Sequence, residues 1–209
     1  SKEKDPPLRL CRVQSMHPTL AHHIFAEAVL MQSSGAHLVT EKIREICIMN
    51  GAQRREFVRN HRTCVFGYPR KAHGPSMSCV YYVMDGDDIL VSSMLGRAKP
   101  KAVKRNGRVS LCILDEKWPP TYITVYGNAT VEEKGGDSLL IEICELMAEQ
   151  PMPEEERITL RKLAIEEKRC VIRVKPESTF ETPPRHVYNP NDVDSLSHSY
   201  GTTLDWNAE

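Results

Sequence analysis

The sequence lacks both an excess of charge of one sign and a long hydrophobic run. Its 28 lysine and arginine residues are balanced by 28 aspartate and glutamate residues, so the formal net charge is zero. A neutral chain has no overall field to attract nucleic acid or anionic lipid, and neither is expected as a partner. No uninterrupted apolar stretch approaches the ~18 residues of a membrane-spanning helix, and residues 1–7 form no apolar signal segment. We therefore expect no membrane association and a cytoplasmic location.

The sequence also lacks paired cysteines and the common catalytic motifs. Its seven cysteines are an odd number without a CxxC pair, and most of them lie within apolar runs. We interpret them as small core residues in a reducing compartment, and we expect no disulfide framework and no metal site. GxSxG, HExxH, P-loop and Rossmann glycine motifs are all missing. The catalytic residues therefore stay unknown at this stage.

What the sequence does contain is a block of short apolar segments separated by turns. Strands are expected at residues 63–68, 77–83, 89–93, 108–114 and 122–131, with a sixth strand at 170–174. Asp85-Gly86 is the strongest hairpin signal in the chain and should join the second strand to the third. Ile123, Val125 and Ala129 alternate with polar residues, as is typical of a half-buried strand.

Segments before, within and after this block of strands have the spacing of apolar residues that is typical of helices. Helices are expected at 19–32, 40–50, 53–59, 137–149 and 154–168, and a basic helix follows the third strand at about 97–106. Asn50-Gly51 is interpreted as the end of the helix at 40–50. This order predicts a mainly β fold, an antiparallel barrel of about six strands with added helices, one pair of which is inserted before the last strand. We divide the chain into a helical N-terminal segment (1–60), the barrel (61–175) and a C-terminal extension (176–209).

A possible phosphate site follows the third strand. Ser92 and Ser93 provide hydroxyl groups, and Lys99 precedes Pro100, a residue that suits the first turn of a helix. Phosphate binding requires positive charge and several donors, and a helix N-terminus adds backbone N–H groups. Arg97 adds charge to the same patch. On the residues alone, the alternative is a solvated basic helix face.

Four segments together resemble the pyridoxamine 5'-phosphate oxidase-like family of FMN-binding split β-barrels. They are Ser92-Ser93, Lys99, Arg108-Val-Ser-Leu111 and Gly127-Asn-Ala129. By this resemblance Lys99 stands at the family's phosphate-binding lysine. Ala102-Val103 replaces an Asn-Leu pair of the family pattern, Gly107 replaces a proline, and Arg97-Ala98 replaces a Ser-Arg pair. The substrate-binding residues of true pyridoxamine phosphate oxidases have no match here, so that specific activity is not expected.

The resemblance implies a split barrel and a homodimer with FMN at the subunit interface. The protein would be an FMN-dependent oxidoreductase acting on a small-molecule substrate. Its implied cofactor-binding residues are Lys99, Ser92, Ser93 and Arg97 near the phosphate, Ser76, Met77 and Ser78 along the flavin ring, and Trp118 in a loop near the cofactor or the dimer partner. Two alternatives stay open, a deazaflavin-dependent reductase on the same fold and a non-catalytic flavin- or haem-binding protein.

The tail after Pro176 allows two interpretations. It is polar and rich in turn residues, yet it carries Phe180, Tyr188, Tyr200 and Trp206. Exposed aromatic area is unfavourable, so these side chains are expected to pack on a surface. That surface is either near the cofactor, where the tail would shape substrate access, or on the chain's own barrel, where it would act as a structural strap.

Overall fold

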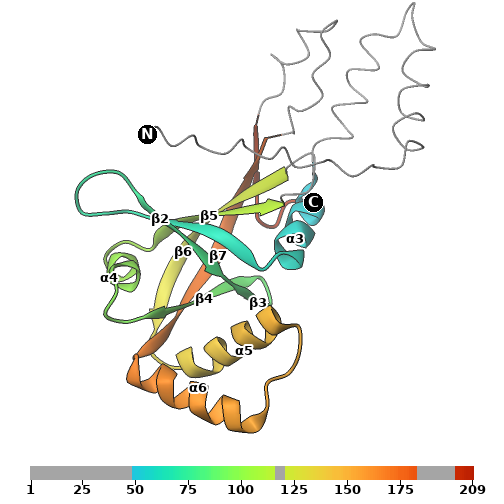
Figure 1. The fold of residues 1–209 in the computed structure, drawn as a ribbon. Helices are drawn as coiled ribbons and strands as arrows, with labels where there is room; N and C mark the ends of the chain where they lie inside the picture. Colours follow the sequence, from blue (N-terminus) through green and yellow to red (C-terminus); the bar gives the residue numbers. More distant parts are fainter. Residues whose placement is uncertain (1–48, 116–120, 183–200) are drawn as a thin grey trace, which may run out of the picture. The chain divides into compact units, whose positions relative to one another are not determined.

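The computed structural model describes residues 49–115, 121–182 and 201–209, and the fold below refers to these residues (Figure 1). The helix expected at 19–32, most of the helix expected at 40–50, and Trp118 lie outside the described ranges. No helix within the described ranges is long and apolar enough to cross a membrane.

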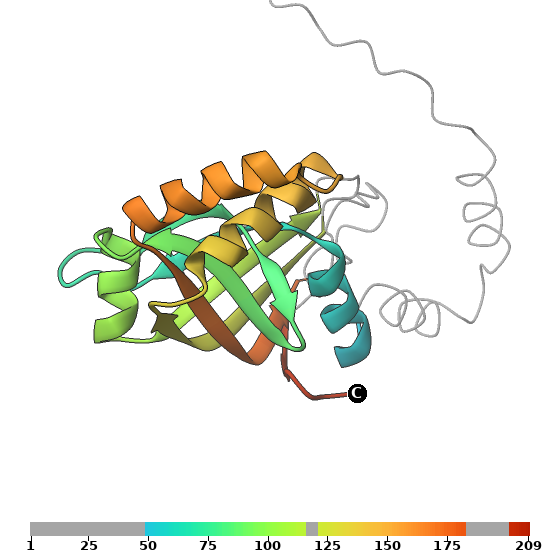
Figure 2. The ribbon, with the colours of Figure 1, turned by 90° about the horizontal axis from the view of Figure 1, so that it is seen from below.

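The strands form one antiparallel sheet that curls around a hydrophobic core (Figures 1 and 2). In the described residues they are β1 (Thr63–Tyr68), β2 (Ser76–Tyr81), β3 (Val83–Asp85), β4 (Asp88–Met94), β5 (Arg108–Asp115), β6 (Thr121–Glu132), β7 (Arg169–Glu181) and β8 (Thr202–Asp205). The sheet order is β2-β1-β5-β6-β7-β4-β3, and β8 pairs with β7. The expected antiparallel split barrel is confirmed, although the sheet has eight strands rather than about six.

The expected hairpin between the second and third strands is present as β3–β4. Asp85 pairs with Asp88, which leaves a loop of two residues. Gly86 is the first of these and has a φ of 61°. Glycine adopts positive φ without a steric penalty, so the Asp-Gly sequence is the physical reason for this turn.

The strand expected at 77–83 is wrong in one respect, because the chain turns a corner at Tyr82 and divides it into β2 and β3. The Tyr82 side chain is buried, and its hydroxyl donates a hydrogen bond to the Val58 carbonyl at 2.6 Å. The Tyr82 amide donates to the Arg62 carbonyl at 2.9 Å. These bonds hold the corner against the preceding helix.

Four helices accompany the sheet in the described residues: α3 (Gly51–Asn60), α4 (Ala98–Arg105), α5 (Gly136–Ala148) and α6 (Glu154–Glu166). The start of α3 corrects the interpretation of Asn50-Gly51 as the end of a preceding helix. Asn50 is the N-cap of α3. Its side-chain oxygen accepts a hydrogen bond from the backbone N–H of Gln53, and the side-chain oxygen of Gln53 accepts one from the backbone N–H of Asn50, both at 2.9 Å. This reciprocal capping box begins a helix.

The last strand of the expected barrel is also longer than the sequence indicated. It was expected at 170–174, but β7 continues through Pro176 to Glu181 and pairs with β6 and β8. The register shifts between Tyr126 and Gly127, opposite Pro176. Proline has no N–H for the ladder and is tolerated at such irregularities. Residues 176–181, assigned to the C-terminal extension above, therefore complete the sheet.

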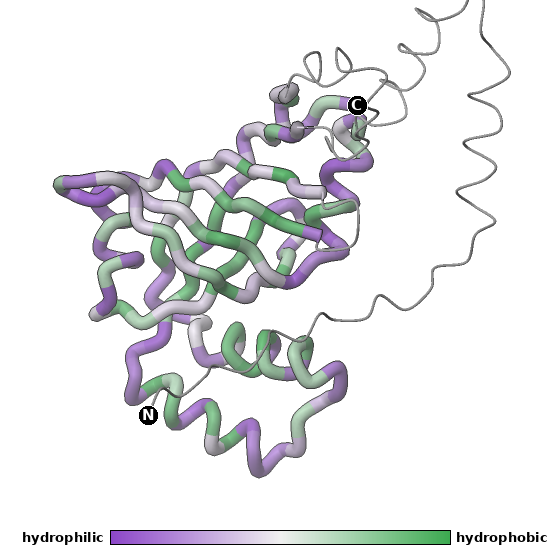
Figure 3. Tube along the Cα trace, turned by 45° about the horizontal axis from the view of Figure 1, so that its top comes forward, coloured by the Kyte–Doolittle hydropathy of each residue, from purple (hydrophilic) through white to green (hydrophobic). Residues whose placement is uncertain are grey.

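Two clusters of buried side chains hold these elements together. The larger cluster fills the inside of the curled sheet, where Figure 3 shows hydrophobic residues along the strands; it includes Phe66, Ile89, Val91, Leu111, Val125 and Ile172. The smaller cluster joins the sheet to α5 through Leu139, Ile143, Val83 and Val171. The helix α4 contacts β1, β4 and β6 and contributes Val103 to the larger cluster.

Candidate functional site

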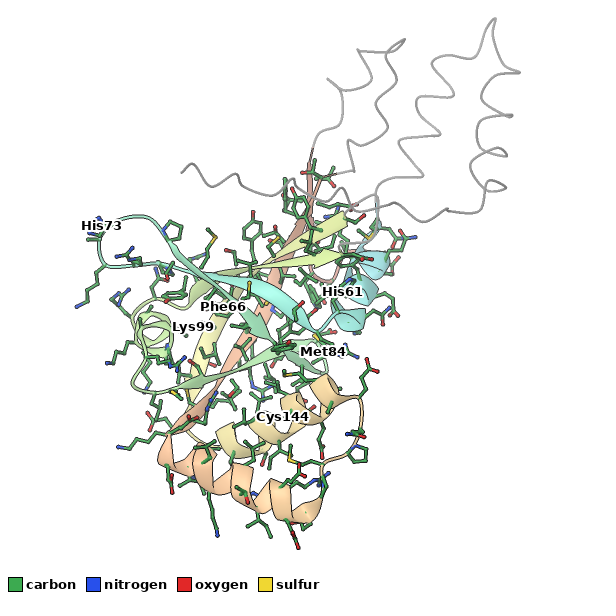
Figure 4. All side chains as sticks on the ribbon, in the orientation of Figure 1. His61, Phe66, His73, Met84, Lys99 and Cys144 are labelled. Carbon is green, nitrogen blue, oxygen red and sulfur yellow. The ribbon has the colours of Figure 1, made fainter. Side chains whose placement is uncertain are left out.

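Lys99 is the second residue of α4, and its side chain points toward the barrel core. Its Nζ atom lies 5.0 Å from the centroid of the Phe66 ring, a side chain with no exposed surface (Figure 4). Burial lowers the pKa of Lys99, an effect that nearby Cys64 opposes. The described residues provide no ion-pair partner and no hydrogen-bond acceptor for this ammonium group. A half-buried cation with only an aromatic face beside it is suited to receive an anion.

Ser78 lies on the same face of the sheet as Phe66. It pairs with Phe66 across β1 and β2, and Ser76 pairs with Tyr68. Directly opposite residues of an antiparallel pair project to the same face. The Ser78 hydroxyl is buried and has no hydrogen-bond partner in the structure. Ser76 and Ser78 are therefore brought to the face on which Lys99 lies, and Ser78 carries an unused donor.

Met77 lies on the opposite face from these two serines. It is 69% exposed and pairs with Gly67, while Gly67 also pairs with Ser110. The three residues expected together along a flavin ring are therefore divided between the two faces of β2, as the alternation of side chains requires.

Ser92 and Ser93 are divided in the same way. Ser93 is buried on the core face of β4 with Val91, whereas Ser92 shares the other face with Leu90, which packs against the cluster below α5. The Ser92 hydroxyl is buried and has no hydrogen-bond partner in the part of the chain that the structure describes. Because neighbouring residues of a strand point to opposite faces, the two hydroxyls are not brought together for one phosphate group.

Arg97 lies just before α4 and is exposed to solvent. It occupies the N-cap position but makes no side-chain capping hydrogen bond. Its positive charge adds to the lowering of the pKa of Lys99 that burial causes. Among the described residues no side chain caps the first turn of α4, so the N-terminal N–H groups of this turn, other than at Pro100, add to the donors in this region.

Several basic residues near this region were not predicted as part of the site. Arg70 and Lys71, in the loop after β1, line an open pocket of about 540 Å³ together with Lys101 and Arg105 of α4. The i, i+4 spacing of Lys101 and Arg105 was visible in the sequence, and so was the dipeptide Arg70-Lys71. Their meeting across one pocket depends on the path of the chain between them.

Large exposed apolar or aromatic side chains lie on the outer face of the sheet, on β2, β5 and β6. One row of paired residues crosses four strands of this face: Met77 on β2, Gly67 on β1, Ser110 on β5 and Tyr126 on β6. Met77 and Tyr126 are exposed in this row, and so is Leu114 further along β5. Large exposed apolar side chains on one face of a sheet can be buried by a partner.

Comparisons with known proteins agree with this fold. The sequence profile of the family described as pyridoxamine 5'-phosphate oxidase matches residues 51–182. A conserved hypothetical protein from Mycobacterium tuberculosis has a similar structure, with a TM-score of 0.55 and 18% identity over 64% of this chain and 84% of its own.

A second similar structure is a Clostridium acetobutylicum protein related to general stress protein 26 of Bacillus subtilis, described as of the pyridoxinephosphate oxidase family. Its TM-score is 0.51, with 12% identity over 74% of this chain and 93% of its own. The chain matches none of the curated proteins with which it was compared. At these identities the two structures support the fold, and the profile match extends over more than half of the sequence. The chain belongs to the pyridoxamine 5'-phosphate oxidase family.

Proposed function

We propose that the protein is a flavin-dependent oxidoreductase that binds FMN at a homodimer interface and oxidises or reduces a small organic substrate. Membership of the family supports the class of cofactor. The observation that carries the proposal is the ammonium group of Lys99, half-buried over Phe66 without an anionic partner in the described residues. Placing an unpaired charge away from water is costly, and a bound phosphate would compensate for it.

The residues around Lys99 fit a phosphate group. Arg97 adds a second cation, and the uncapped start of α4 adds backbone N–H donors. The buried Ser78 hydroxyl is an unused donor on the face of Phe66. Of the two predicted serines of β4, Ser93 faces the core and Ser92 faces α5, so Ser93 is the one we retain in the proposal.

The edge of the sheet can receive the flat part of the cofactor. β2 ends the sheet order of the described strands, so one row of its backbone N–H and C=O groups is not used in the ladder. Such groups are positioned to hydrogen-bond a planar ring with alternating donors and acceptors. A bound flavin supplies the redox chemistry, while the chain supplies orientation and electrostatics. The catalytic side chains and the substrate are not part of the proposal.

The dimer is proposed from the outer face of the sheet. Burying Met77, Leu114 and Tyr126 against a second copy would remove exposed apolar area from water. Tyr126→Asp should therefore dissociate the dimer in light scattering. Ile165→Asp is the matched control, because Ile165 is 65% exposed on α6, away from this face. Dissociation by both variants, or by neither, would contradict this choice of interface.

Titration of the apo-protein with FMN tests the cofactor site. Lys99→Ala removes one charge-assisted contact, worth about 1.5–3 kcal/mol, and should weaken FMN binding about tenfold or more. Lys104→Ala is the control on the same helix, since Lys104 is exposed and pairs with Glu133 at 2.6 Å. Equal FMN affinity in Lys99→Ala and the wild type would exclude Lys99 from the site.

The identity of the bound cofactor can be tested directly. Mass spectrometry of the ligand released from freshly purified protein distinguishes FMN from a deazaflavin or haem. We expect FMN and a flavin absorbance spectrum. A deazaflavin would instead support the related reductase. A flavin that no pair of reductant and acceptor can cycle would support a binding protein.

A further inference from the structure

A basic pocket lies between the loop after β1 and the helix α4. Its volume is about 540 Å³, and four of its lining residues are Arg70, Lys71, Lys101 and Arg105. Tyr68, at the end of β1, adds an aromatic wall. We call these five residues the basic pocket. Figure 4 shows α4 beside the long loop that carries His73, the same loop that provides Arg70 and Lys71.

Within the described residues, no carboxylate pairs with the cations of the basic pocket. No acidic residue is among its lining residues, and none of its four cations forms an ion pair within the described residues. By contrast, Lys104 on the same helix pairs with Glu133, and Arg173 contacts three carboxylates. Like charges gathered around a concave surface repel one another and focus a positive potential into it. An anion in the pocket would relieve this repulsion.

One of the four cations is held in place by the backbone. Arg105 donates a hydrogen bond from Nη2 to the carbonyl of Pro69 at 3.0 Å. This bond joins the end of α4 to the start of the loop and orients the guanidinium at the pocket. An oriented guanidinium is suited to the geometry of phosphate and carboxylate groups.

The pocket is formed by a different face of α4 from the one that carries Lys99. One face of α4 lines the pocket through four residues at i, i+3, i+4 and i+7 spacing, namely Ala98, Lys101, Ala102 and Arg105. Lys99 is neither on this face nor among the lining residues. The two alanines leave room between the long basic side chains. The Lys99 ammonium lies instead over Phe66, toward the core. The structure therefore has two separate cationic positions along α4.

We propose that the basic pocket binds a phosphate-class anionic group other than the phosphate held at Lys99. This group belongs either to the substrate or to a cofactor longer than FMN. Both sources present the same chemistry to the pocket, namely an oxyanion that accepts hydrogen bonds from lysine and arginine. The proposal adds a ligand subsite to the proposed function, but binding of a simple anion tests it without any flavin.

Calorimetric titration with pyrophosphate is the direct test. The wild-type protein should bind pyrophosphate at low ionic strength, and Lys101→Gln and Arg70→Gln should each bind it about tenfold more weakly, because each loses one charge-assisted contact. Neither side chain makes a hydrogen bond or ion pair within the described residues, so both variants should keep the wild-type melting temperature. Lys104→Gln removes the same charge from the same helix outside the pocket and should bind within about twofold of wild type.

Three results would overturn the proposal: no binding of pyrophosphate to the wild type, unchanged affinity in Lys101→Gln, or an equal loss in Lys104→Gln. The last result would mean that pyrophosphate responds only to the overall charge of α4. The same titrations are repeated in the Lys99→Ala background, where the proposed phosphate position over Phe66 has lost its cation and only the basic pocket is expected to bind pyrophosphate. Failure here is then distinguishable from failure of the proposed function.

Flavin titrations of Lys101→Gln then identify the source of the anion. Weaker binding of FAD with unchanged binding of FMN would place a second phosphate of the cofactor in the basic pocket. Unchanged binding of both flavins, with weakened binding of pyrophosphate, would assign the pocket to the substrate. A loss of FMN affinity equal to that of Lys99→Ala would refute the separation of the two positions.

Discussion

Replacing Arg54 should destabilise the protein more than replacing any exposed arginine of the same helix. Arg54 and Glu181 are 0% and 1% exposed and form an ion pair between α3 and β7, with Nε and Oε2 3.3 Å apart. Arg54 also donates to the carbonyls of Met49, Thr179 and Thr202 at 3.0, 3.2 and 3.1 Å. One guanidinium therefore joins α3 to the two C-terminal strands.

The variant Arg54→Met keeps an unbranched side chain but removes the charge and all of these donors. Glu181 would remain buried, and the Met49 amide, which donates to its Oε2 at 3.1 Å, would be its remaining hydrogen-bond donor among the described residues. Removing one partner of a buried ion pair typically lowers the free energy of unfolding by about 3–5 kcal/mol. That is a large part of the roughly 5–15 kcal/mol by which domains are stable. Urea denaturation followed by the fluorescence of Trp206, which is buried beside β8, measures the change.

Arg59→Met is the matched control. Arg59 lies on the same helix and pairs with Asp87, but both side chains are more than a third exposed, so the loss should stay below about 1 kcal/mol. The double variant Arg54→Met with Glu181→Leu removes both buried charges and should recover much of the lost stability. A loss in Arg54→Met no larger than in Arg59→Met would refute the reasoning, and so would a double variant less stable than Arg54→Met alone.

The pH dependence provides a second measurement of the same pair. Burial raises the pKa of Glu181 in the folded state, while Arg54 and the Met49 amide oppose the rise. A folded-state pKa above the unfolded one means that the folded state binds the proton more tightly. The resulting stabilisation is present below the unfolded pKa and is lost as the pH rises through the folded pKa. Arg54→Met removes the main opposing charge, so its stability should fall more steeply than that of wild type from pH 4.5 upward.

Three further predictions concern the site, the sheet and the C-terminus. Because burial lowers the pKa of Lys99, FMN affinity should fall as the pH rises through that pKa. Lys99→Arg should retain affinity at higher pH in the same titration of the apo-protein with FMN. Gly127→Ala should lower the free energy of unfolding in urea by about 1–3 kcal/mol, because its Cβ would lie 2.5 Å from the Lys175 carbonyl oxygen. Gly74→Ala is the control: a Cβ there meets open space, so the free energy of unfolding should change by less than about 0.5 kcal/mol. Deleting residues 201–209 removes β8 and the Thr202 carbonyl that accepts from Arg54. The melting temperature should therefore fall by a large amount. A protein that melts normally but binds the cofactor with altered affinity is not expected.

The described part of the tail supports the structural strap among the two interpretations of the C-terminus. β8 pairs with β7 through residues 202–205, and Trp206 is 4% exposed within the core of the same chain. The Trp206 amide also donates to the carbonyl of Glu177 at 2.9 Å. Residues 183–200 lie outside the described ranges, so any contact between them and a cofactor stays a prediction.

Local patterns in the sequence were sufficient for most of the elements. The helices α5 and α6 begin and end within a residue or two of the expected bounds, because their periodicity and their flanking prolines and glycines act over neighbouring residues. The turn at Gly86 was equally local. The separation of Ser92 from Ser93 could also have been predicted, since side chains alternate along any strand. The prediction that both hydroxyls bind one phosphate group did not take this alternation into account.

Contacts between distant residues were decided only by the tertiary structure. Arg54 and Glu181 are far apart in the sequence, and neither residue type indicates its own burial or its partner. The basic pocket likewise combines a loop and a helix that have no shared local pattern. The sequence by itself therefore determined most of the described strands and helices, the resemblance to the family and Lys99 as a candidate cation. It did not determine β8, the full length of β7 or the division between β2 and β3. The strand register and the path of the chain decided which groups face one another, because a residue's local periodicity carries no information about its partner across the sheet.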